Sequence, residues 1–196
     1  EDYAQVMDRT RGLSPHITGV SPYVSKEAML LSQQSVAGVS VKGIVPGNKI
    51  FEQDFLTVDD QAVDEALFQE HDGLPGIIIG LDTATALGVA VGDRLNVIPP
   101  MFTITPFGMI PKMKPFRIIG IFSQRRGFLD TYFAYVSLTA SQGMFNLEGA
   151  ASGVEVEVSS FDHANGVAED LRQGFGYPFV VRSWEDLFGS FLSALK

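Results

Sequence analysis

The sequence predicts an α+β fold in which both chain ends form one layer and the middle of the chain is inserted as a second subdomain. Three observations support this fold class. Hydrophobic residues make up 45% of the 196 residues, which is enough for a substantial core. Short apolar or alternating stretches recur between Gly and Pro breaks, as is typical of strands. Short helical patterns lie between these stretches.

The first part of the chain predicts a helix followed by two strands. Residues 2–12 favour a short helix, and Gly12 suits the position after its end. Residues 16–32 and 36–45 favour strands, because valines alternate with small or polar residues in the second of them. Pro46 begins a break after the second strand.

The middle of the chain predicts several short strands and three short helices. An acidic stretch favours a helix near residues 60–69. The elements expected after it are a buried strand at 76–80, a helix at 83–87 capped by Asp82 and closed by Gly88, strands at 95–98, 116–122 and 132–138, and a helix at 140–145 capped by Thr139.

The last part of the chain predicts a strand at 154–158, a helix at 162–173, a strand at 179–181 and a closing helix capped by Ser183. This order resembles that of the first part. We therefore expect residues 1–47 and 151–196 to form one subdomain, with residues 48–150 inserted. The final residues form an amphipathic helical pattern without a cap, so we expect the natural chain to continue.

Composition excludes several classes of function. The net charge of −9 argues against a general nucleic-acid binder, since such proteins usually carry a basic face. The absence of cysteine excludes disulfides, cysteine-ligated zinc and a cysteine nucleophile. No run of about 18 apolar residues occurs, so nothing in this sequence is expected to span a bilayer.

The sequence contains no recognisable catalytic or cofactor motif. The three histidines, His16, His71 and His163, have neither a second histidine nor a carboxylate at metal-ligand spacing, so we expect no metal site. No glycine-rich nucleotide loop and no G-x-S-x-G nucleophile elbow occur. We therefore expect a binding domain, with no cofactor, rather than an enzyme.

Residues 99–115 depart from ordinary loop composition. The segment contains five prolines, which exclude a helix and a central strand, yet most of its other residues are apolar. An apolar loop of this length must be buried or must meet a partner. Three interpretations remain open: a hairpin folded back on its own sheet, a membrane-surface loop, and a hairpin that docks a protein. Because prolines stiffen a loop, they favour the last.

Charge is distributed unevenly around this segment. Six basic residues and no acidic residue lie between Arg94 and Arg126, whereas the rest of the chain holds eight basic and 23 acidic residues. Such a dipole suits the steering of an acidic protein or an anionic surface.

Several motifs together resemble a known family. In order along the chain they are Gly76–Gly80, Leu87–Asp93, Thr105–Gly108 with Pro111, Phe116–Phe122, and Ser183-Trp184 with Phe191 and Ala194–Lys196. Their order and spacing resemble the periplasmic domain of lipoprotein-releasing ABC transporter permeases, the LolC/LolE group of the MacB-like superfamily.

The resemblance implies an architecture, a location and partners. It implies a Porter-like subdomain from the chain ends, a Sabre-like inserted subdomain, and a place on the periplasmic side of the inner membrane. It also implies a second permease subunit, LolE-like or another copy, and an ATPase that binds through the membrane part of the protein. A MacB- or FtsX-like domain that binds an adaptor or transmits movement is the alternative.

The resemblance also implies a binding hairpin called the Hook, within residues 99–115, that recruits the periplasmic carrier LolA. Its length here favours a LolC-like subunit. The implied Hook residues are Thr105, Pro106, Phe107, Gly108, Met109, Ile110 and Pro111. The implied pad beside it comprises Lys112, Met113, Lys114 and Asn96. Met113 replaces a polar residue of the family, and Asn96 replaces a basic one.

Overall fold

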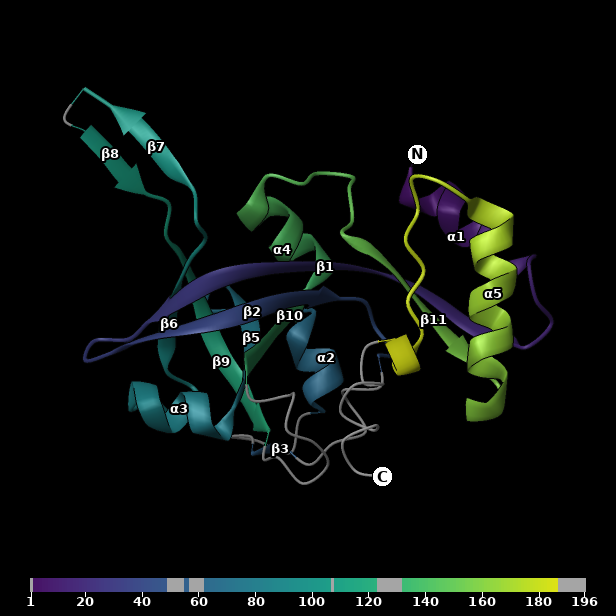
Figure 1. The fold of residues 1–196 in the computed structure, drawn as a ribbon. Helices are drawn as coiled ribbons and strands as arrows, with labels where there is room; N and C mark the ends of the chain where they lie inside the picture. The colour runs from purple at the N-terminus through teal and green to yellow at the C-terminus, as the bar shows by residue number, and fades with distance from the viewer. Residues whose placement is uncertain (1, 49–54, 57–61, 107, 123–131, 187–196) are drawn as a thin grey trace. The chain divides into compact units, whose positions relative to one another are not determined.

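The computed structural model describes residues 2–48, 55–56, 62–106, 108–122 and 132–186, and the chain divides into two compact units (Figure 1). The smaller unit contains residues 1–22 and 153–196, and the larger unit contains residues 23–152. This boundary differs from the expected one, because the strand near 36–45 belongs to the larger unit. That strand pairs on both sides with strands of the larger unit, so it cannot be grouped with the chain ends.

A closed barrel forms the larger unit. Its strands are β1 (Ile17–Leu31), β2 (Val36–Ile44), β5 (Leu74–Gly80), β6 (Arg94–Ile98), β9 (Lys114–Phe122) and β10 (Phe133–Ser137). They follow the order β9-β6-β1-β2-β10-β5, and a parallel pairing of β5 with β9 closes the ring. The short strands β3 (Phe55–Leu56) and β4 (Glu70–His71) pair with β9 and β5. Closure leaves few free strand edges, which limits unwanted edge-to-edge pairing.

The main hydrophobic core fills the barrel. Val24, Leu95 and Phe116 are fully buried there, and the helices α3 (Leu81–Leu87) and α4 (Leu138–Phe145) add side chains to the same cluster. A second cluster lies where α2 (Val63–Leu67) packs on the outer side of β5, β9 and β10. Among the described residues, the outer side of β6 and β1 contributes to neither cluster, and β2 contributes only its last residue, Ile44, to the second.

The expected strands of the larger unit are confirmed, but two helix caps are wrong. Gly80 occupies the N-cap position of α3, and Asp82 lies within the first turn. Ser137 rather than Thr139 caps α4, since its side chain accepts a hydrogen bond from Ala140 N–H. In both places a strand runs directly into a helix, so the helix begins earlier than the sequence pattern indicated.

The smaller unit contains α1 (Tyr3–Arg11), β11 (Gly153–Val158), a 3₁₀ turn (Phe161–His163) and α5 (Ala164–Phe175). β11 pairs with β1, which contributes residues to both units. The expected helix near 2–12 and the expected strand near 154–158 are confirmed, while the helix expected at 162–173 starts and ends about two residues later.

The prediction of a strand at 179–181 is wrong, because backbone groups of this stretch form hydrogen bonds outside any strand ladder. Phe179 N–H donates to Gly176 O at 3.0 Å in a turn, and the Arg172 guanidinium reaches Val181 O at 3.4 Å. No strand is assigned to this stretch.

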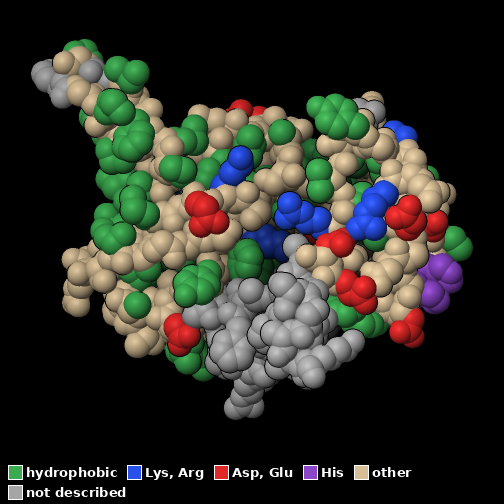
Figure 2. All heavy atoms as spheres, viewed as in Figure 1, with side chains coloured by type: hydrophobic (Ala, Val, Ile, Leu, Met, Phe, Trp, Pro, Cys, Tyr) green, Lys and Arg blue, Asp and Glu red, His purple; other side chains and the backbone are tan. Residues whose placement is uncertain are grey.

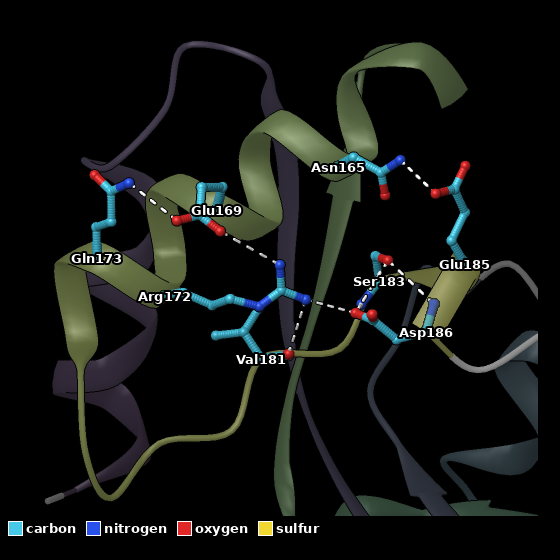
Figure 3. A network of polar contacts seen from close by, with 8 residues as sticks. All are labelled: Asn165, Glu169, Arg172, Gln173, Val181, Ser183, Glu185 and Asp186. Carbon is cyan, nitrogen blue, oxygen red and sulfur yellow. Dashed lines mark hydrogen bonds and ion pairs between the residues drawn. The ribbon is translucent and has the colours of Figure 1, made fainter. Parts of the chain in front are cut away.

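A polar network fixes the segment that follows α5 (Figure 3). Arg172 Nη2 lies 2.5 Å from Asp186 Oδ2, and Ser183 N–H donates to the same oxygen at 2.7 Å. In return, Asp186 N–H donates to Ser183 Oγ at 3.3 Å, which confirms Ser183 as a helix cap. The Ser183 backbone N–H lowers the pKa of Asp186, and the Ser183 hydroxyl and Arg172 contribute further lowering.

Candidate docking hairpin

The proline-rich segment forms a two-stranded hairpin that is separate from the barrel sheet (Figure 1). Its strands are β7 (Phe102–Thr105) and β8 (Gly108–Pro111), and they continue outward from β6 and β9. Residues 106 and 107 connect the strands, and Gly108 has a φ of 120°, which favours glycine. The prolines at 99 and 100 interrupt the ladder between β6 and the hairpin.

One face of the hairpin is apolar and exposed. Directly paired residues of an antiparallel ladder lie on the same face, and Phe102 pairs with Pro111 as Ile104 pairs with Met109. Met113 follows the same alternation on the returning chain. Phe102 is 59% exposed, Ile104 85% and Met109 65%, which rules out a hairpin folded back on its own sheet. We call Phe102, Ile104, Met109, Pro111 and Met113 the apolar face.

The base of the hairpin is attached to the end of α4. Lys112 Nζ donates to Asn146 Oδ1 at 2.7 Å, and Lys112 N–H donates to Met101 O at 3.0 Å. Lys114 Nζ lies 3.5 Å from the position that a Cβ on Gly143 would occupy. Because α4 has no basic residue in its last turn, the two lysines supply the positive charge that a helix C-terminus attracts.

The four residues of the implied pad therefore lie on two different sides. Lys112 and Lys114 are half-buried and point toward α4, whereas Met113 is exposed on the opposite side. Asn96 lies between Leu95 and Val97, whose side chains are buried inside the barrel, so alternation places Asn96 on the outer side. Asn96 pairs with Pro115 in the ladder.

The implied Hook residues are only part of the exposed hairpin surface. Pro106, Met109, Ile110 and Pro111 are exposed, and Thr105 ends β7. Phe107 lies outside the described residues. The sequence reasoning did not count Phe102 and Ile104 among the site residues, although they lie opposite Pro111 and Met109 in the ladder. The alternation Phe-Thr-Ile-Thr at 102–105 was the signal that predicts a two-faced strand there.

The basic residues near the hairpin are less available than their number suggests. Arg117 is paired with Asp72 at 2.7 Å and donates to Gly92 O at 2.8 Å. Arg125 and Arg126 lie outside the described residues. Among the described residues, the positive charge beside the hairpin therefore comes mainly from Lys112 and Lys114, with Arg94 exposed on β6.

The histidines are not grouped for catalysis. His16 and His163 stack with ring centroids 3.8 Å apart, although they are far apart in sequence, and His163 Nδ1 lies 3.0 Å from Ser159 Oγ. His71 Nε2 lies 2.8 Å from Ala66 O. Among the described residues, no group of three or more His, Cys, Asp or Glu could hold a metal ion.

Within the described ranges, no helix is long and apolar enough to cross a membrane.

The chain matches a family model over most of its length. The model describes a MacB-like periplasmic core domain and matches residues 1–174. Two solved structures have the same fold. The extracellular domain of YknZ, a noncanonic ABC-type transporter from Gram-positive bacteria, has a TM-score of 0.55 at 14% identity, covering 91% of this chain and 84% of that chain. The periplasmic region of MacB from Actinobacillus actinomycetemcomitans also has a TM-score of 0.55, at 15% identity, covering 95% and 81%.

Curated relatives are similar over nearly the whole chain. The lipoprotein-releasing system transmembrane protein LolC of Xylella fastidiosa is 30% identical over 183 residues, which are 93% of this chain and 43% of that protein. The LolC protein of Neisseria meningitidis serogroup B is 27% identical, covering 92% and 43%. The LolE protein of Haemophilus influenzae is 22% identical, covering 94% and 44%. The chain thus spans less than half the length of these relatives.

Proposed function

Because the chain belongs to the family of MacB-like periplasmic core domains, we propose that it is the periplasmic domain of an ABC transporter permease that releases lipoproteins from the inner membrane. The similarity to LolC proteins over 93% and 92% of the chain supports this assignment. The partners within the transporter are a second permease subunit, LolE-like or another copy, and an ATPase bound through the membrane part of the protein.

The domain recruits a LolA-like periplasmic carrier through the hairpin. The observation that carries this proposal is the exposed apolar face, which has no counterpart to cover it among the described residues. A hairpin bordered by prolines loses little conformational freedom on docking, so its apolar side chains can contribute most of their burial energy to affinity. Lys112 and Lys114 add positive charge that steers an acidic carrier to the hairpin.

A second candidate function is adaptor binding or movement transmission, as in a MacB- or FtsX-like system. The fold alone is compatible with this function, because MacB and YknZ have similar domains. A protruding apolar hairpin favours the lipoprotein carrier, since mere transmission of movement does not require one.

Binding of a purified LolA-like carrier to this domain, measured by surface plasmon resonance, tests the proposal. Ile104→Asp should abolish or strongly weaken binding, because it places a carboxylate in the centre of the apolar face. Leu81→Asp is the matched control, since Leu81 is 40% exposed on α3, away from the hairpin. Equal binding of wild type and Ile104→Asp would contradict carrier recruitment by the hairpin.

A further inference from the structure

The hairpin by itself is small for a protein-docking site. It comprises residues 102–111, whereas each partner in a standard stable interface contributes roughly 20–30 residues. A carrier that remains bound long enough to receive cargo therefore needs contacts on the body of the larger unit. These contacts should lie on the side of the hairpin where the neighbouring barrel surface is apolar and exposed.

One side of the hairpin is already used. Lys112 and Lys114 attach the base to the end of α4, through the Asn146 hydrogen bond and the approach to Gly143. A partner on this side would have to displace these contacts or contact the polar C-terminus of α4. The opposite side remains available.

The apolar face continues from the hairpin onto the outer wall of the barrel. Val97 pairs with Lys114 in the ladder, and beyond the prolines Lys112 N–H donates to Met101 O. The returning chain therefore keeps its alternation from the hairpin into the barrel, with Lys112 and Lys114 on one face and Met113 on the other. Ile98, on the outer side of β6, pairs with Met29 on β1. Met29 is 48% exposed, although it lies in the middle of a sheet. Figure 2 shows hydrophobic side chains that continue from the hairpin onto the adjoining part of the larger unit.

These side chains have a shared chemistry. We call the apolar face together with Met29 and Ile98 the apolar strip, and Glu27, exposed two residues before Met29 on β1, marks its charged border. Three of its members, Met29, Met109 and Met113, are methionines, whose unbranched side chains adapt to differently shaped apolar surfaces. Neither buried cluster of the described residues includes Met29 or Ile98.

We propose that the outer wall of the barrel at Met29 and Ile98 is the second half of the carrier-docking surface. The occupant is the same carrier that binds the hairpin, which presents an uncharged apolar surface to the strip. Continuity with the hairpin, the small size of the hairpin and the attachment of its other side to α4 support this choice. The inference rests on the proposed function.

Carrier binding to three variants tests the inference, again by surface plasmon resonance on the folded domain. Met29→Lys should raise Kd about tenfold or more, because a charge would replace a contact within the buried interface. Leu81→Lys, which changes a side chain of similar exposure on α3, should bind as wild type does. Ile104→Lys places the same charge on the hairpin and tests whether the hairpin binds the carrier; it should lose binding.

The outcomes separate this inference from the proposed function. If Ile104→Lys loses binding while Met29→Lys binds as wild type does, the docking surface ends at the hairpin and the inference is wrong. If Ile104→Lys also binds normally, both the inference and carrier recruitment fail. A photo-crosslinking amino acid at position 29 provides a second measurement that does not depend on the lysine variant folding. It should capture the carrier in wild-type background, and an equal yield from position 81 would overturn the inference.

Discussion

Truncation of Ile104 should weaken carrier binding without changing the stability of the domain. The side chain is 85% exposed in the free domain, so nearly all of its burial occurs on binding. Burying an isoleucine side chain contributes about 1.5–3 kcal/mol, and alanine retains only a small part of this. Ile104→Ala should therefore cost about 1–2 kcal/mol of binding free energy, or about 5- to 30-fold in Kd. The free energy of unfolding should change by less than about 0.5 kcal/mol, since the substitution is on the surface.

Ile119→Ala provides the opposite case. Ile119 is 8% exposed and lies in the cluster beneath α2, so its truncation should cost about 2–5 kcal/mol of stability. Its carrier affinity should be unchanged under conditions where the domain remains folded. Surface plasmon resonance should show that Ile104→Ala acts mainly through faster dissociation, and urea titration should give the unfolding free energies. If Ile104→Ala destabilises the domain as Ile119→Ala does, the hairpin is part of the core and the reasoning is refuted.

Three other measurements test separate parts of the structure. Replacing residues 102–111 with Asn-Gly should leave the melting temperature nearly unchanged, and a large fall would show that the hairpin stabilises the barrel. Lys112→Glu with Lys114→Glu should slow carrier association and flatten its salt dependence, whereas Asn146→Ala keeps both charges and should preserve the salt dependence. Asp186→Asn should destabilise the smaller unit at neutral pH. Because folding lowers the pKa of Asp186, its contribution is present above the ordinary aspartate pKa and is lost as the pH falls through the lowered value, so wild type and variant should converge in acid. A pH-independent difference in thermal denaturation would contradict this.

Much of the secondary structure could be predicted because it depends on local patterns. Alternating valines in β2, the isoleucine run in β5 and glycine after α3 each reflect a constraint within a few residues. The hairpin could be predicted in the same way, since the prolines exclude the other regular structures for residues 99–115.

Non-local pairing could not be predicted from these patterns. The pairing of β2 with β10 places β2 in the larger unit and so sets the boundary between the units. The pairing of β5 with β9 closes the barrel. Likewise, the stretch 179–181 has the composition of a strand, but Arg172 and a local turn occupy its backbone groups. The contact between Lys112 and Asn146 joins residues far apart in sequence, so the pattern suggested a free lysine.

An exposed apolar hairpin is expected to be unstable and prone to self-association, and its attachment to the larger unit counteracts both effects. A two-stranded hairpin is only marginally stable alone in water, and an exposed apolar one is prone to self-association. Here the hairpin continues two strands of a closed barrel, and Lys112 attaches its base to α4. Its strands are short and its prolines remove N–H donors, so it offers a poor edge for pairing with another copy. The barrel thus fixes the orientation of the apolar face, while the short, proline-interrupted strands limit pairing between copies. Both features favour binding of a partner over aggregation.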